Sequence, residues 1–125
     1  MSRKILLVDD EDDIREVAQM SLEMTAGWEV VTAPSGADAL RTAAAERPDA
    51  ILLDVMMPGM DGPATARALR AEPDTAEIPI ILLTAKVQAA DRRRFDDLGV
   101  AGILAKPFDP IALADQVREV LGWPG

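Results

Sequence analysis

The chain of 125 residues contains no cysteine and no histidine. Without cysteine it forms neither a disulfide bond nor a thiolate nucleophile, and without both residues it lacks the usual ligands of zinc. The absence of histidine also excludes a Ser-His-Asp triad and acid–base catalysis by imidazole. Any chemistry of this chain must therefore use carboxylate, hydroxyl, amine or backbone groups.

Basic residues are clearly outnumbered by acidic ones. The chain has 13 lysines and arginines against 22 aspartates and glutamates, which gives a net charge of −9 at pH 7. A charge of this sign repels the phosphates of nucleic acids and anionic lipid. We therefore expect no direct binding to nucleic acid and no binding to a membrane.

No apolar run is long enough for a membrane span or for the core of a signal peptide, because the N-terminal run already ends where Val8 meets Asp9. We therefore expect a cytoplasmic protein. With 49% hydrophobic residues, a chain of this length can bury the core of one domain. We expect a single domain over residues 1–125, without an effector domain.

Short apolar runs without polar alternation predict strands that are buried on both faces. A further candidate, Trp28 to Thr32, contains polar residues and is typical of a less buried edge strand. The fully apolar runs are Ile5 to Val8, Ala50 to Leu53, Ile80 to Leu83 and Ile103 to Ala105.

Segments with helical periodicity separate these runs, and capping residues or prolines mark several of their ends. The first helix is expected to place Ile14, Val17, Ala18 and Leu22 on its inner face. The second, capped by Ser35, is expected to face inward with Leu40, Ala43 and Ala44. A third should begin near Asp61-Gly62-Pro63, a fourth should include Val87, Asp91, Arg94, Phe95 and Leu98, and a fifth, capped by Asp109, should include Leu113, Val117, Val120 and Leu121. Strict alternation of five strands and five helices predicts a doubly wound parallel α/β sheet.

Polar side chains follow the buried runs at the point where each run ends. In an open α/β sheet the binding crevice lies outside the carboxyl ends of the strands, so these side chains should meet there. Each of them alone is an ordinary loop residue, but together they come from four separate strands. They are Asp9 and Asp10 after the first strand, Asp54 after the third, Thr84 after the fourth and Lys106 after the fifth.

Three carboxylates at one edge of a sheet repel one another, and they need a cation to stay charged at close range. Oxygen ligands suit a hard ion, so Mg²⁺ is the first expectation, followed by Mn²⁺ or Ca²⁺. A carboxylate, a hydroxyl and a lysine around such an ion can transfer a phosphoryl group. We expect Asp54 to be the nucleophile, Lys106 to offset the phosphoryl charge, and Thr84 to donate to a phosphoryl oxygen.

Four motifs surround these residues, and their order and spacing are specific. They are Val8-Asp9-Asp10-Glu11-Asp12, the segment Leu53 to Gly62 with the pattern Asp-x-x-Met-Pro-Gly-x-Asp-Gly, Leu83-Thr84-Ala85, and Lys106-Pro107-Phe108. Together they resemble the response-regulator receiver domains, and the resemblance covers essentially the whole chain. It implies a flavodoxin-like sheet with the strand order 2-1-3-4-5.

The resemblance also implies a metal site that contains Asp54. Asp10 would bind Mg²⁺ directly, Asp9 would support the ion largely through water, and the backbone carbonyl of Met56 would add a ligand. Asp54 would take its phosphoryl group from a phosphohistidine of a kinase or phosphotransfer protein. The phosphorylated chain would then signal by docking to a downstream protein.

Further implications concern the residues around the phosphoryl group. Thr84, Ala85 and Lys106 would stabilise the group, and the Lys106–Pro107 peptide bond would be cis. Thr84 and the residue three before the lysine would form the switch. That residue is Ile103, where many receivers carry an aromatic ring.

The resemblance also implies that two positions tune hydrolysis of the aspartyl phosphate, namely those two residues past Asp54 and two past Thr84. They are Met56 and Lys86. A methionine cannot orient an attacking water as an asparagine can, so the sequence predicts a long-lived phosphate.

Two other functions fit a doubly wound sheet. One is an interaction module of the same fold that never uses Asp54, and the complete set of site residues argues against it. The other is a Mg²⁺-dependent phosphohydrolase with an aspartyl intermediate. Enzymes of that class carry the motif Asp-x-Asp-x-Thr after the first strand. This chain has Asp9-Asp10-Glu11 there and so lacks the motif.

Overall fold

The computed structural model describes residues 3–85 and 95–124. Its strands form one parallel sheet in the order β2-β1-β3-β4-β5, which confirms the predicted doubly wound topology. The strands are β1 (Lys4–Val8), β2 (Glu29–Ala33), β3 (Ala50–Asp54), β4 (Ile80–Thr84) and β5 (Gly102–Ala105).

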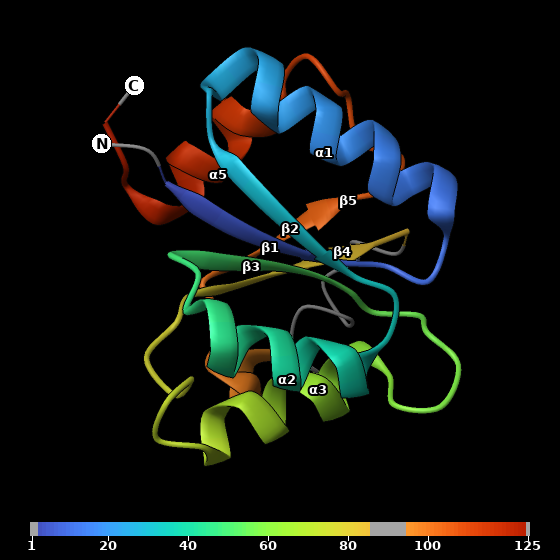
Figure 1. Ribbon diagram of the computed structural model, residues 1–125, viewed down its shortest axis with the longest axis vertical. Helices are drawn as coiled ribbons and strands as arrows, with labels where there is room; N and C mark the ends of the chain where they lie inside the picture. Colours follow the sequence, from blue (N-terminus) through green and yellow to red (C-terminus); the bar gives the residue numbers. More distant parts are fainter. Residues whose placement is uncertain (1–2, 86–94, 125) are drawn as a thin grey trace.

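Helices cover both faces of this sheet (Figure 1). One layer contains α1 (Asp12–Ala26) and α5 (Leu113–Leu121), and the opposite layer contains α2 (Gly36–Glu46) and α3 (Gly62–Ala71). Most of the expected fourth helix, at 86–94, lies outside the described residues. Its expected C-terminal part contains a 3-10 turn, η1 (Asp96–Leu98). No helix among the residues described is long and apolar enough to cross a membrane.

The core has two halves, one under each layer of helices, because successive strand side chains point to opposite faces. In β3, for example, Ile51 and Leu53 pack under α2 and α3, whereas Leu52 packs under α1 and α5. Strands β1, β3 and β4 are central and almost fully buried, as predicted. The expectation of full burial was wrong for Ile103–Ala105, because β5 is an edge strand and is only half-buried.

Two residues expected to face inward are exposed instead. Val17 on α1 has an exposed fraction of 46%, and Ala44 on α2 is also exposed. The buried positions of α1 include Ser21, whose hydroxyl donates to the carbonyl of Pro110. Ala18 and Leu22 are buried as predicted, and this polar contact lets a serine share the inner face with them in place of Val17.

The predicted helix caps have different outcomes in α2 and α5. The Ser35 hydroxyl accepts from the amide of Asp38 at 3.2 Å, which confirms the predicted cap of α2. The cap predicted at Asp109 was wrong, because α5 begins only at Leu113. The Asp109 carboxylate instead accepts from the amide of Ile111 at 2.9 Å and closes a separate turn before the helix.

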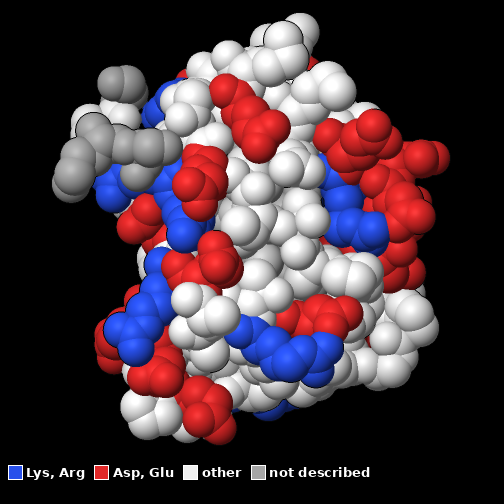
Figure 2. Space-filling model, in the orientation of Figure 1, with Lys and Arg blue, Asp and Glu red and all other residues white. Residues whose placement is uncertain are grey.

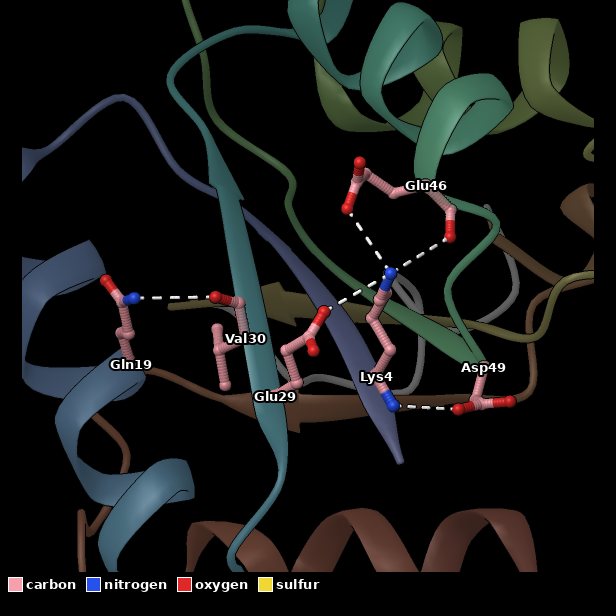
Figure 3. A network of polar contacts seen from close by, with 6 residues as sticks. All are labelled: Lys4, Gln19, Glu29, Val30, Glu46 and Asp49. Atoms are coloured by element: carbon pink, nitrogen blue, oxygen red, sulfur yellow. Dashed lines mark hydrogen bonds and ion pairs between the residues drawn. The ribbon is translucent and has the colours of Figure 1, made fainter. Parts of the chain in front are cut away.

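A polar network joins three elements at the amino end of β1 (Figure 3). The Lys4 ammonium lies 3.2 Å from Glu29 on β2 and 3.3 Å from Glu46 at the end of α2. The Lys4 amide donates to Asp49, just before β3, at 2.7 Å. Partly exposed ion pairs of this kind contribute little stability, and they accompany the backbone pairing of β1 with β2.

We expect Gly102→Ala to destabilise the fold by about 1–3 kcal/mol, because the new Cβ would lie 2.6 Å from Val120 Cγ1 on α5. Valine is stiff at χ1 and cannot turn away easily. The double variant with Val120→Ala should lose less stability than the two single variants lose together, since Val120→Ala makes room for the new methyl group. Urea unfolding of all four proteins measures this coupling, and costs that add within about 0.5 kcal/mol would contradict it.

Candidate functional site

Three carboxylates and one ammonium group meet at the carboxyl edge of the sheet. Asp9 and Asp10 follow β1, and Asp54 is the last residue of β3. Each offers a carboxylate oxygen within 4.8 Å of the others. Lys106, which follows β5, reaches the same point across the end of β4. The structure therefore brings together the acids and the lysine that sequence placed at strand ends.

Lys106 lies between two of these acids. Its Nζ is 2.9 Å from Asp9 Oδ2 and 3.2 Å from Asp54 Oδ1. The side chains are nearly buried, with exposed fractions of 12% for Lys106, 0% for Asp9 and 4% for Asp54. One positive charge thus offsets two negative charges in a place where water does not screen them well.

Asp9 and Asp10 differ in their surroundings although they are neighbours. The Asp9 carboxylate also accepts from the Glu11 amide at 2.9 Å, so its oxygens are held from two sides. Asp10 is exposed. The carboxylates together form an oxygen-only donor set with one member open to solvent, and this fits a hard divalent ion such as Mg²⁺ that keeps several waters.

The surroundings shift the pKa of Asp54 upward from its ordinary value of 3.8. Burial is the main cause, and the charge of Asp9 adds to it. Lys106 and the backbone amide of Met56 act in the opposite direction without cancelling the shift. Burial alone would lower the pKa of Lys106, but its contacts with Asp9 and Asp54 outweigh burial and raise it. The Asp54 carboxylate is therefore poorly stabilised without a further cation.

Thr84 and Ile103 lie on the sheet face that α2 and α3 cover. Ile103 pairs with Leu82 in the register of β4 and β5 and packs against the same core cluster as Leu82. Thr84, two residues after Leu82, ends β4 with an exposed fraction of 4%. Ala85 is exposed just beyond it. Lys86 lies outside the described residues.

The loop after β3 carries the other expected residues. Met56 has an exposed fraction of 76%, whereas its neighbour Met57 is buried in the core. The Lys106–Pro107 peptide bond, which follows β5, is cis, the isomer expected from the resemblance.

Sequence patterns did not show the role of Gly62. A Cβ at this position would lie 2.5 Å from the carbonyl oxygen of Asp54 and 2.7 Å from the Cα of Val55. The start of α3 can therefore approach the end of β3 this closely only with glycine. The Asp-Gly pair in the motif is the signal that could have suggested such a contact.

A second residue that sequence patterns missed is Arg15 on α1. Its Nη1 donates to the carbonyl oxygen of Asp9 at 2.6 Å, and its Nη2 forms an ion pair with Asp12. The available signal was the spacing of three residues between Asp12 and Arg15, which on a helix brings the two side chains together. That spacing predicts the ion pair but not the contact with Asp9.

Acidic side chains are concentrated at this end of the molecule. Figure 2 shows them gathered at the end where α1 begins, beside a basic group. The four residues from Asp10 to Asp13 are all acidic and exposed. Such a surface attracts divalent cations and basic groups of a partner.

Comparisons with known proteins agree with this geometry. The family model described as response regulator receiver domain matches residues 5–118. The structure of the chemotaxis protein CheY4 from Vibrio cholerae superimposes with a TM-score of 0.90 and 35% identity, covering 96% of this chain and 99% of that one. The signal receiver domain of a signal transduction histidine kinase from Syntrophus aciditrophicus superimposes with a TM-score of 0.83 and 36% identity, covering 97% of this chain and 91% of that one.

Curated relatives are longer. The probable transcriptional regulator ycf27 of Cyanophora paradoxa is 44% identical over 95% of this chain and 48% of its own length. The alkaline phosphatase synthesis transcriptional regulatory protein PhoP of Bacillus subtilis is 40% identical over 97% of this chain and 49% of its own length. The chain thus spans about half the length of these relatives.

The raised pKa of Asp54 leads to a prediction for the metal-free protein. The folded chain keeps the Asp54 proton to a higher pH than the unfolded chain. Stability therefore falls as pH rises from the ordinary pKa of 3.8 through the raised pKa of the folded chain. Asp54→Asn should therefore raise the Tm near neutral pH, and the gain should shrink toward the ordinary value of 3.8, where wild type becomes protonated in both states.

Thermal unfolding in a chelator over a series of pH values measures this difference. Asp74→Asn removes an exposed aspartate and serves as the control, with a change in stability within about 0.5 kcal/mol. A gain for Asp54→Asn that stays constant at every pH would show that ionisation of Asp54 is not its cause.

Proposed function

The chain belongs to the family of response regulator receiver domains, and from that premise we propose that Asp54 accepts a phosphoryl group from a phosphohistidine of a kinase or phosphotransfer protein. The observation that carries this proposal is the placement of Lys106 against Asp9 and Asp54, with Asp10 open to solvent beside them. A buried nucleophile, a paired cation and an accessible metal ligand at one edge are the parts that phosphoryl transfer needs.

In the proposed step a carboxylate oxygen of Asp54 attacks phosphorus in line with the leaving nitrogen. The P–N bond breaks as the P–O bond forms, and the electron pair of the broken bond stays on the imidazole of the donor. Lys106, already within 3.2 Å of Asp54, neutralises a phosphoryl oxygen, and the Thr84 hydroxyl donates to another. Mg²⁺, when bound by Asp9, Asp10, Asp54 and the Met56 carbonyl, supplies further neutralisation of charge.

An apolar groove beside the site supports a protein as the donor. Its two connected parts share Val17 on α1 and Pro110, and its end nearest the site is lined by Asp13 and Pro107. Exposed large apolar side chains continue it, among them Met24 and Ile111 with exposed fractions of 79% and 81%. A helix with apolar anchors and basic flanking residues fits this apolar groove with its acidic end.

We further propose that the phosphorylated chain acts by docking to a downstream protein and catalyses only its own phosphorylation and dephosphorylation. Thr84 and Ile103 lie on the same face of β4 and β5, which supports a coupled movement of the two. An isoleucine there offers a smaller side chain than an aromatic ring. A cytoplasmic location stays a prediction from the sequence.

Incubation with Mg²⁺ and a small acyl phosphate tests the acceptor. Intact mass should show one added phosphoryl group on wild type, none on Asp54→Ala and none in the presence of a chelator. Asp74→Ala, which removes an exposed aspartate between α3 and the amino end of β4, should still gain one group.

The same experiment separates the alternatives. Release of many equivalents of phosphate from a small phosphoester would favour the phosphohydrolase. A folded wild-type protein that gains no phosphate, and yet binds its partner normally, would favour the interaction module that never uses Asp54.

Met56→Asn should shorten the lifetime of the aspartyl phosphate. An amide can orient an attacking water without taking its proton, so we expect roughly tenfold faster decay, below the 10²–10⁴ of a positioned general base. Loss of labelled phosphate over time measures the rate. Met24→Asn is a matched control, because Met56 and Met24 have exposed fractions of 76% and 79%. Unchanged or slower decay in Met56→Asn would refute the role of Met56.

A further inference from the structure

We propose that Arg15 is a positioning residue for the metal site, and that it sets the direction in which the Asp10 carboxylate leaves the backbone. The inference rests on the proposed function, because it takes Asp10 as a ligand of the divalent ion. It adds to that site a residue from α1 that does not itself touch the ion.

The contacts of Arg15 define one orientation of its guanidinium group. Nη1 donates to the carbonyl oxygen of Asp9 at 2.6 Å, and Nη2 is paired with the Asp12 carboxylate. The Arg15 side chain has an exposed fraction of only 18%. Because a guanidinium group is planar and presents its donors as a rigid fork, two contacts at two nitrogens are enough to fix it.

The carbonyl contact acts directly on Asp10. The carbonyl of Asp9 and the amide of Asp10 belong to one planar peptide unit, so holding the oxygen holds the whole unit. On the other side of Asp10, the Glu11 amide donates to Asp9 Oδ1 at 2.9 Å. These two contacts bracket Asp10, whose own carboxylate has no hydrogen-bond or ion-pair partner within residues 3–85 and 95–124.

Asp9 needs no help of this kind. Its amide donates to the carbonyl of Ala33 at 3.2 Å, and its carboxylate is held by Lys106 at 2.9 Å as well as by the Glu11 amide. Its side chain is therefore fixed without Arg15. The contact at the Asp9 carbonyl consequently matters most for the next residue along the chain, which is Asp10.

Charge and geometry make opposite predictions for the loss of Arg15. If only the positive charge of Arg15 mattered, removing it would strengthen the binding of a cation to the nearby carboxylates. If Arg15 positions Asp10, removing it lets the peptide unit turn and weakens binding. Asp12 already offsets part of the charge of Arg15, so we expect the effect of position to be larger.

Calorimetric titration with Mg²⁺ alone tests the proposal on the full chain. Arg15→Met should bind Mg²⁺ about tenfold more weakly than wild type, the lower end of the loss seen when outer partners of a metal site are removed. Arg15→Lys keeps the charge but not the planar fork, so its affinity should fall between the two. In the metal-free protein, the ¹⁵N shift of the Asp10 amide should move in Arg15→Met.

Arg118→Met is the matched control. Arg118 also pairs with an acid three residues before it and has an exposed fraction of 20%, but it lies on α5 against Trp28. Its loss should lower stability while leaving the affinity for Mg²⁺ unchanged. Circular dichroism shows whether each variant is folded. If Arg15→Met does not fold, the affinity of Arg15→Lys for Mg²⁺ decides whether Arg15 positions Asp10.

Equal or tighter binding of Mg²⁺ by the folded Arg15 variants would overturn the proposal, since it would leave Arg15 with a charge effect or none. In that case wild-type binding and phosphorylation of Asp54 stand, and only the role of Arg15 fails. Absence of Mg²⁺ binding by wild type would overturn the proposed metal site and this inference together.

Discussion

The ammonium group of Lys106 lies 2.9 Å from Asp9 and 3.2 Å from Asp54, and it connects residues that follow or end β1, β3 and β5. Strand β4 separates β3 from β5, so only a long side chain reaches across its end. The contact with Lys106 offsets part of the effect of burial on Asp54, although the pKa of Asp54 stays raised. The rest of the site depends on this partial neutralisation, because it leaves the cluster of Asp9, Asp10 and Asp54 able to hold one more cation.

The layers of the fold explain why the site lies at an edge. Helices cover both faces of the central strands, so only their ends meet water. Carbonyl and carboxylate oxygens can therefore collect at the carboxyl edge, while at the amino edge Lys4 forms ion pairs with Glu29 and Glu46. The same edge is bordered by the acidic start of α1 and by the apolar groove that begins near Pro107. Both features support the proposal that the partner is a basic, amphipathic protein rather than a small free substrate.

Strands and helix ends were predictable where one local rule decided them. Runs such as Ile80 to Leu83 have no polar alternation, and the cap at Ser35 depends on residues three apart. Local rules failed where a distant contact decided the outcome. Ser21 can be buried because the carbonyl of Pro110, far along the chain, accepts a hydrogen bond from its hydroxyl. Helix α5 begins after Asp109 because the Asp109 carboxylate closes a separate turn with the amide of Ile111. The apolar run at β5 could not show that no strand pairs on its outer side within the described part of the chain.

The sequence by itself determined the chemistry of the site. The residue types after the strands, together with the absence of cysteine and histidine, left carboxylates, a lysine and a hydroxyl, and the alternation of elements placed them at one edge. Only the tertiary structure decided their mutual distances, the open position of Asp10 and the contacts of Arg15 and Gly62 with backbone carbonyls. The physical reason is that a side chain's chemistry is local, whereas its burial and its contacts with backbone depend on segments that packing alone brings together.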